Sequence, residues 1–163
     1  MENVSILEEE SQKGLFLTFA LGSESFGLEI TEVKEIVGMQ PITPLPETPA
    51  YVKGIINLRG RIIPVIDIRL RFGKEGVAYT DRTCIIVVYI NGAAVGLIVD
   101  NVSEVLTIQD DQIVPPPKYG AGAQNRYLKA IGKVGNEVKL LLDCNTLLNA
   151  GDMNMLQNLG GEQ

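Results

Sequence analysis

The sequence predicts an all-β protein built from two small β-barrels and followed by a short C-terminal helix. Three observations predict this fold. A long segment of the chain recurs, each copy contains short runs with the apolar pattern of strands, and turn residues such as Gly and Asn separate these runs. Each copy holds about five such strands, which is typical of a small barrel. With 163 residues, 45% of them hydrophobic, the chain can bury a sizeable core.

The internal repeat is visible without gaps over its first part. Leu15–Val37 aligns on Cys84–Leu106 at an offset of 69 residues, and the alignment resumes at an offset of 76 residues, where Tyr51 meets Tyr127. The seven additional residues of the second copy fall in a Pro- and Gly-rich segment, Pro115–Gly122. Loops accept insertions at low cost, so this is where two diverging copies are expected to differ.

Each copy contains the signals of strands and hairpins. Apolar residues alternate along 15–21, whereas 84–90 is continuously apolar and β-branched, as in a strand buried on both faces. Asn91-Gly92 and Arg59-Gly60 mark tight turns. Pro64 lacks a backbone donor, so we expect its strand at an edge or a bulge.

The chain divides into four expected segments. Residues 1–14 are acidic and polar, and we expect a flexible N-terminus without the features of a secretory signal. The first barrel is predicted over 15–80 and the second over 81–150, followed by a tail over 151–163. A helix is expected over Asn145–Leu159, at the junction of the second barrel and the tail.

The composition argues against catalysis. The chain has no histidine, which removes triads based on Ser–His–Asp or Cys–His and the commonest metal ligand. Cys84 and Cys144 are too far apart for a zinc motif, and Cys144 takes the repeat position of Ile68, which indicates core filling. Asp67 and Asp143 share a repeat position, which favours a role in the fold. We therefore expect no enzyme activity, no cofactor and no metal.

Charge and hydropathy indicate the location and the class of partner. The net charge of −6 and an aromatic content of 6% disfavour the main alternative, an OB-like nucleic-acid-binding domain, which needs a basic groove and exposed aromatic rings. Apolar runs are too short to span a membrane. Two distant cysteines fit a cytoplasmic protein with reduced thiols. With catalysis, nucleic-acid binding and a membrane span all disfavoured, we expect a role in protein–protein interaction.

The repeat also separates structural positions from candidate binding positions. Residues shared by both copies, such as Gly27 and Gly96, are expected to serve the fold, and Glu35 and Glu104 share a position as well. A structural role for Glu35 is therefore one alternative and a binding role the other. The positions particular to the first copy are Asn57, Arg59 and Pro64. An arginine on a rigid turn suits a protein interface, although a solvated turn residue is the other interpretation.

Six segments carry a resemblance to a known family. They are Phe26–Ile30 (FGLEI), Val33–Ile36 (VKEI), Val52–Gly60 (VKGIINLRG), Ile63–Ile68 (IPVIDI), Val95–Val105 (VGLIVDNVSEV) and Tyr127–Gly132 (YLKAIG). They resemble the CheW-like domain family, which includes the bacterial chemotaxis coupling proteins, over about residues 15–148. The length fits a free-standing coupling protein, because a kinase of this family would add phosphotransfer and ATP-binding domains.

The resemblance implies a fold and a function. Members of the family consist of two five-stranded, SH3- or OB-like barrels that exchange strands, so the boundary near residue 80 is approximate. The coupling protein is a non-catalytic adaptor between the cytoplasmic tips of methyl-accepting chemoreceptors and the regulatory domain of the CheA histidine kinase. It would therefore be cytoplasmic and peripheral to the inner membrane through receptor arrays, with no membrane insertion and no nucleic-acid partner.

The resemblance also implies which residues bind. The expected partner-binding residues are Val33, Glu35, Ile36, Gly54, Asn57, Arg59, Gly60, Val99 and Val102. The two valines Val99 and Val102 would line an apolar groove between the barrels that accepts a helical hairpin of the receptor. The chain departs from the family pattern at Ala130, where relatives usually have glycine. An alanine would strain the backbone there if the position had a positive φ.

Overall fold

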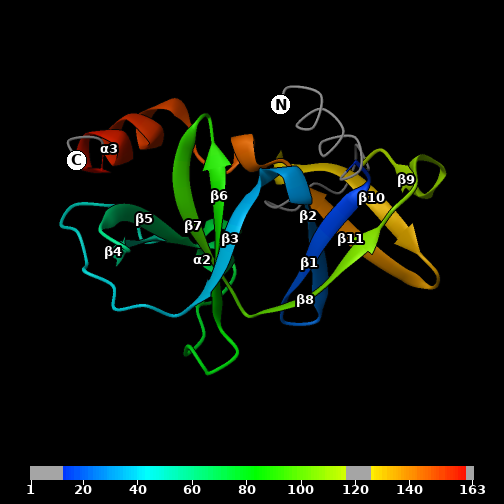
Figure 1. The fold of residues 1–163 in the computed structure, drawn as a ribbon, viewed down its shortest axis with the longest axis horizontal. Coiled ribbons are helices and arrows are strands. Elements are labelled where there is room, and N and C mark those ends of the chain that lie inside the picture. The colour runs from blue at the N-terminus through cyan, green and yellow to red at the C-terminus, as the bar shows by residue number, and fades with distance from the viewer. Residues whose placement is uncertain (1–12, 117–125, 161–163) are drawn as a thin grey trace.

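The computed structural model describes residues 13–116 and 126–160, and most of their strands belong to two sheets that lie side by side (Figure 1). One sheet contains β1 (Leu15–Leu21), β2 (Glu24–Glu29), β8 (Asn101–Thr107), β9 (Ile113–Val114), β10 (Leu128–Val134) and β11 (Glu137–Leu142). The other contains β3 (Val33–Gly38), β4 (Val52–Leu58), β5 (Arg61–Asp67), β6 (Cys84–Ile90) and β7 (Ala93–Val99). The short helical elements are η1 (Ile30–Glu32), α2 (Ile68–Arg71), η2 (Asp110–Gln112), η4 (Cys144–Thr146) and α3 (Ala150–Gly160).

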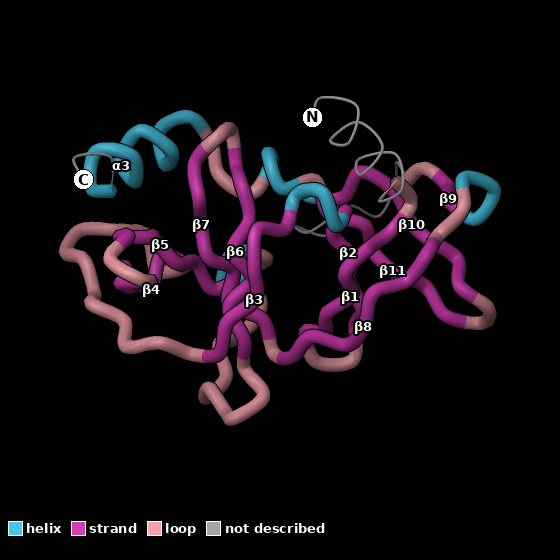
Figure 2. Tube along the Cα trace, viewed as in Figure 1, coloured by secondary structure: helices cyan, strands magenta, loops and turns pink. Residues whose placement is uncertain are grey.

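The two copies of the repeat exchange hairpins, as expected. The six-stranded sheet has the order β8-β1-β2-β11-β10-β9, so the first copy's β1–β2 hairpin lies among strands of the second copy. The five-stranded sheet has the order β3-β6-β7-β5-β4, in which the second copy's β6–β7 hairpin lies among strands of the first. Each exchange creates one parallel pair, β11 with β2 and β5 with β7. Figure 2 shows the two groups of strands.

Glycine at one repeat position permits both parallel pairs. Leu141 lies opposite Gly27 in one pair, and Val65 lies opposite Gly96 in the other. A Cβ atom at Gly27 would lie 2.8 Å from Cδ2 of Leu141, and one at Gly96 would lie 2.7 Å from Cγ1 of Val65. The repeat therefore keeps glycine at this position because the neighbouring strand approaches too closely for a side chain.

The prediction of an all-β fold with a short C-terminal helix is correct, but the word barrel is too strong. Neither sheet closes by strand pairing. In the five-stranded sheet the edge strands are β3 and β4. The loop that joins them pairs with β4 through one isolated bridge, between Thr43 and Ile55. Because each sheet draws strands from both copies, the ranges 15–80 and 81–150 describe the two copies of the repeat, and as domain boundaries they remain a prediction.

The largest core cluster contains residues from both copies. Aromatic rings run through it in a chain, with centroid separations of 5.5 Å between Phe19 and Phe26, 5.5 Å between Phe26 and Phe72, and 5.1 Å between Phe72 and Tyr127. Each fully buried ring or aliphatic side chain contributes about 1.5–3 kcal/mol. Cys144 is fully buried in the same cluster, which agrees with its expected role as core filler.

The strand that contains Pro64 was expected at an edge or a bulge, and the structure has the bulge. Strand β5 is not an edge strand, because β7 and β4 flank it, but its pairing with β4 shifts register between Val52 and Gly54, which lie opposite Ile66 and Val65 next to Pro64. Its pairing with β7 begins one residue later, at Val65, so the proline precedes that ladder. The C-terminal helix begins at Ala150 rather than Asn145, since the side chain of Asn149 accepts a hydrogen bond from Asp152 N at 2.7 Å and caps the helix there. Most of the inserted Pro115–Gly122 segment lies outside the described residues.

Candidate protein-interaction site

The β4–β5 hairpin depends on Gly54 for its backbone path. Gly54 has a φ of +142°, and a Cβ atom there would lie 2.1 Å from the carbonyl oxygen of Thr43. This close approach allows Thr43 and Ile55 to exchange two backbone hydrogen bonds of 2.9 Å. The equivalent residue in the second copy, Ala130, does not have a positive φ, so the strain considered for it does not arise.

The turn of this hairpin holds an arginine in an unfavourable backbone conformation. Arg59 has a φ of +53° and Gly60 a φ of +86°, and the amide of Gly60 donates to Oδ1 of Asn57 at 2.8 Å. The left-handed region costs a non-glycine residue about 1 kcal/mol. The second copy has Gly135 at this turn, with a φ of +62°. The first copy thus has an arginine at a turn position whose left-handed backbone conformation favours glycine.

The arginine side chain forms an ion pair with Glu35 of β3. The Arg59 side chain is 66% exposed and that of Glu35 is 26% exposed. A pair this exposed contributes about 0–1 kcal/mol to stability. The pair matters more for orientation than for stability, because it sets where the two charged groups lie on the surface of the five-stranded sheet.

Strand β3 also carries an exposed apolar residue, which follows Glu35 in the chain. Ile36 is 43% exposed, whereas Val33 is partly buried and packs against the main core. Strand β3 is also an edge strand, with β6 as its neighbour. Six of the predicted residues lie on β3 and on the β4–β5 hairpin, two segments that the Arg59–Glu35 ion pair joins. They are Glu35, Ile36, Gly54, Asn57, Arg59 and Gly60.

Val99 and Val102 occupy a different place, the point where the chain crosses from one sheet to the other. Val99 ends β7, and Val102 is the second residue of β8. Val99 is 1% exposed and belongs to the main core, while Val102 is partly buried against it. Val99 therefore supports this junction from within, and Val102 is the one with partly accessible surface.

Sequence reasoning missed an ion pair at this junction. The Asp100 carboxylate accepts hydrogen bonds from Nε and Nη2 of Arg69, at 2.8 and 2.6 Å, and from the amide of Gly22 at 2.7 Å. The Arg69 guanidinium holds the pKa of Asp100 below its ordinary value. The three residues come from α2, the β7–β8 crossing and the β1–β2 turn, so no local pattern could indicate the cluster.

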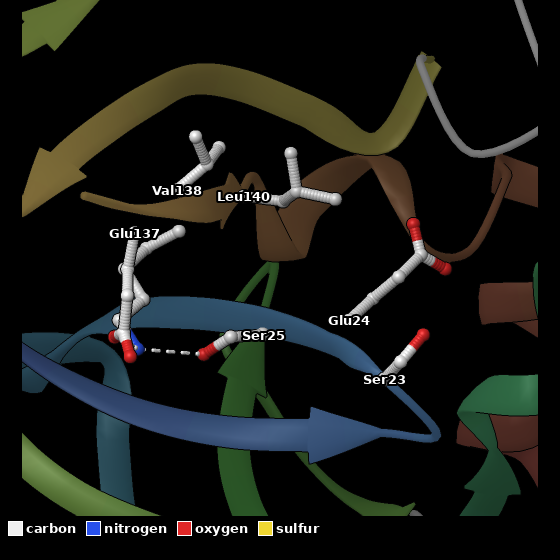
Figure 3. A pocket seen from close by; sticks show the side chains of 7 residues that line it. Ser23, Glu24, Ser25, Glu137, Val138 and Leu140 are labelled. Atoms are coloured by element: carbon white, nitrogen blue, oxygen red, sulfur yellow. Dashed lines mark hydrogen bonds and ion pairs between the residues drawn. The ribbon is translucent and has the colours of Figure 1, made fainter.

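A polar depression of about 440 Å³ lies where β2 and β11 diverge beyond their short parallel pairing (Figure 3). The ammonium of Lys139 lies 3.1 Å from Oγ of Ser25 and 3.0 Å from a carboxylate oxygen of Glu137. Lys139 is 6% exposed, so these two contacts satisfy a nearly buried charge. The depression is thus a junction between β2 and β11 that holds a nearly buried lysine.

Over residues 13–116 and 126–160, no three His, Cys, Asp or Glu side chains come together as metal ligands. The two cysteines are not joined in a disulfide, and burial raises the pKa of the Cys144 thiol. None of the helices in that same part of the chain is long and apolar enough to cross a membrane.

The comparisons with known proteins agree on one family. The model of the CheW-like domain matches residues 15–152. The chain is 37% identical to the chemotaxis protein CheW of Klebsiella aerogenes over 159 residues, which cover 98% of this chain and 96% of that protein. It is 32% identical to the chemotaxis protein CheW of Treponema pallidum over 149 residues, with coverage of 88% and 86%.

A solved structure shows the same fold. The scaffolding protein TtCheW from Thermoanaerobacter tengcongensis superimposes with a TM-score of 0.80 at 38% sequence identity, covering 86% of this chain and 97% of that one. The two sheets with exchanged hairpins are therefore the fold of a scaffolding protein of this family. The chain belongs to the CheW-like domain family, and its class is that of a chemotaxis adaptor.

Proposed function

We propose that this chain is a non-catalytic adaptor that couples the cytoplasmic tips of chemoreceptors to the regulatory domain of the CheA histidine kinase. It would act in the cytoplasm, peripheral to the inner membrane through receptor arrays. The family and the scaffolding relative support this role. The observation that carries it is Arg59, which is held in a left-handed turn, 66% exposed and aligned by Glu35.

Backbone strain at an exposed side chain favours a functional interpretation. A glycine at residue 59 would relieve the strain, and the second copy shows that such a turn forms with Gly135. An arginine offers five donors and a flat face for stacking, which suits contact with a protein surface. The surface for one partner would therefore comprise Arg59, Glu35 and the neighbouring Ile36, with Asn57 and Gly60 shaping the turn and Gly54 its base.

The junction of the two sheets supplies the second proposed surface. Val102 is partly buried there, and it packs against the core cluster that contains Val99 and that its repeat equivalent, Val33, also contacts. Apolar residues between two sheets can receive the apolar side of a helix, and charges at the rim set its register. Each contact can be weak, because an array holds many copies and multivalency raises the effective affinity.

Calorimetric titration tests the bridge directly. The full chain is titrated with the isolated kinase regulatory domain, with a receptor-tip fragment, and with each in the presence of the other. Simultaneous binding of both is expected. Arg59→Glu should weaken at least one of the two interactions by tenfold or more with an unchanged thermal melt, whereas the nearby exposed Arg61→Glu serves as the charge-matched control. A folded chain that binds neither protein would refute the proposal.

A further inference from the structure

The internal repeat relates two pockets of the protein, of which the chain covers one and leaves the other open. The equivalence of the surrounding backbone is close, because Asp67 N donates to Tyr51 O at 2.8 Å and Asp143 N donates to Tyr127 O at 2.8 Å. The first pocket contains Asp67, Arg69 and Asp100, and the second contains their repeat equivalents Asp143, Asn145 and Thr31. We call them the first-copy pocket and the second-copy pocket.

The chain itself fills the first-copy pocket. The segment that follows α2 folds back so that Val77, Tyr79 and Thr83 line it, and a cavity of about 10 Å³ remains. The Tyr79 hydroxyl donates to Oδ2 of Asp67 at 2.9 Å, while Oδ1 of Asp67 accepts from the amide of Leu70 at 3.4 Å. Both carboxylate oxygens are thus engaged, and Asp67 is 4% exposed.

The second-copy pocket has the same carboxylate without the tyrosine. Oδ1 of Asp143 accepts from the amide of Asn145 at 3.1 Å, which repeats the capping bond of the first copy. Within residues 13–116 and 126–160, no hydrogen bond reaches Oδ2 of Asp143, and Asp143 is partly exposed. The pocket volume is about 500 Å³.

The difference follows from where each copy's chain continues. After α2 the chain returns over its own pocket. After η4 the chain enters α3, which packs against β5 and is tied there by a hydrogen bond from the Tyr51 hydroxyl to Asp152 (Figure 1). The residues equivalent to the Tyr79 segment therefore lie in α3, and they are used to cover the five-stranded sheet instead of the second-copy pocket.

The charges around the second-copy pocket restrict its occupant. Glu29 and Glu32 approach the ammonium of Lys129 at 3.0 and 3.4 Å, and Asp143 adds a third carboxylate. A second ammonium, that of Lys34, lies 5.8 Å from the ring centroid of Tyr89 at the edge of the pocket. Three carboxylates against two ammonium groups still disfavour an acidic occupant and favour one that donates hydrogen bonds. Tyr89 is 44% exposed and adds aromatic surface at the same pocket, with Lys34 over one face of its ring.

We propose that the second-copy pocket receives a tyrosine from a partner protein, whose hydroxyl donates to Oδ2 of Asp143 as the Tyr79 hydroxyl donates to Asp67. The segment that carries this tyrosine is neutral or basic. The proposal rests on the proposed function, because the occupant is part of a protein that the adaptor holds. The adaptor's own Tyr79 segment shows the chemistry that the pocket accepts.

The probe is a synthetic peptide with the sequence of residues 74–83, titrated into the full chain and followed by the backbone amide signals of Asn91, Gly92 and Asn145. Saturable shifts at these amides are expected. Asp143→Asn keeps the helix-capping oxygen and removes the second acceptor, so it should weaken peptide binding about tenfold. The peptide with Tyr79→Phe should lose binding by a similar factor, and the exposed Asp111→Asn control should bind as the wild type.

Absence of saturable shifts at the pocket, or equal peptide binding by Asp143→Asn and wild type, would overturn the proposal. The same variant is titrated with the kinase regulatory domain and the receptor tip, where about tenfold weaker binding of one of them is expected. If both proteins bind Asp143→Asn as tightly as the wild type, the pocket proposal fails and the proposed function stands. If neither binds the wild type, the proposed function fails, and the peptide titration decides on the pocket.

Discussion

Arg59 and Glu35 join the two edges of the five-stranded sheet. Strand order places β3, which carries Glu35, at one edge and β4, which leads into the Arg59 turn, at the other. The ion pair spans these edges, which strand pairing leaves open. The repeat equivalents, Glu104 and Gly135, cannot form such a pair because residue 135 has no side chain. The pair is therefore a feature of the first copy alone.

Replacing Arg59 by glycine should separate stability from binding. Glycine relieves the left-handed strain of about 1 kcal/mol while the exposed ion pair is lost, so the free energy of unfolding should stay constant or rise by up to about 1 kcal/mol. Partner binding should fall about tenfold. Urea unfolding and calorimetry measure the two effects. A less stable Arg59→Gly with unchanged binding would show that the residue serves the fold.

Gly54→Ala should destabilise the protein through the backbone. A Cβ atom at this position would overlap the carbonyl oxygen of Thr43 at 2.1 Å, and the φ of +142° is unfavourable for alanine. We expect a loss of about 2–4 kcal/mol in the free energy of unfolding. Gly38→Ala is the matched control, because nothing lies within 4 Å of a Cβ atom there. Equal stability of the two variants would contradict the close approach seen at Gly54.

The Asp100–Arg69 pair should make stability depend on pH in the acid range. The folded protein lowers the pKa of Asp100 below its ordinary value of 3.8, mainly through the hydrogen bond to Arg69. The resulting stabilisation is present above the unfolded pKa and is lost as the pH falls through the lowered folded pKa. Asp100→Asn should therefore cost about 1–2 kcal/mol at pH 7 and progressively less below about pH 4.

Urea unfolding of the wild type and Asp100→Asn between pH 7 and pH 2.5 tests this prediction. The exposed Asp81→Asn is the control for removal of a carboxylate without this ion pair. A stability difference between wild type and Asp100→Asn that stays constant over the whole pH range would show that the charge of Asp100 does not contribute.

Tyr51→Phe should loosen helix α3. The Tyr51 hydroxyl donates to Asp152 near the start of the helix, and burial together with this bond raises the pKa of Tyr51, so the donor stays protonated. Loss of the bond should lower stability by about 1 kcal/mol and speed amide hydrogen exchange at Met153 and Leu156. The exposed Tyr89→Phe is the control. Unchanged exchange in α3 would show that its packing, and not this bond, holds the helix.

Much of the fold could be predicted because turns and strands depend on the types of a few neighbouring residues. The Asn91-Gly92 and Arg59-Gly60 turns and the strands over 15–21 and 84–90 follow from alternation and turn residues, and they occur where expected. The start of α3 was misplaced because the short segment η4 ends at Thr146 and Asn149 caps a new helix after it. The apolar pattern of this segment does not indicate where such a cap lies, so it could not predict the first residue of the helix.

The sequence by itself determined the duplication, the positions of the hairpins, the absence of histidine chemistry and the family. The tertiary structure decided which hairpin joins which sheet, that Glu35 meets Arg59, that Val99 is buried, and that the Tyr79 segment covers one pocket and leaves its counterpart uncovered. The reason is physical. Turns and strand patterns depend on neighbours along the chain, whereas strand exchange, ion pairs and pocket filling depend on how whole faces pack after distant segments have met.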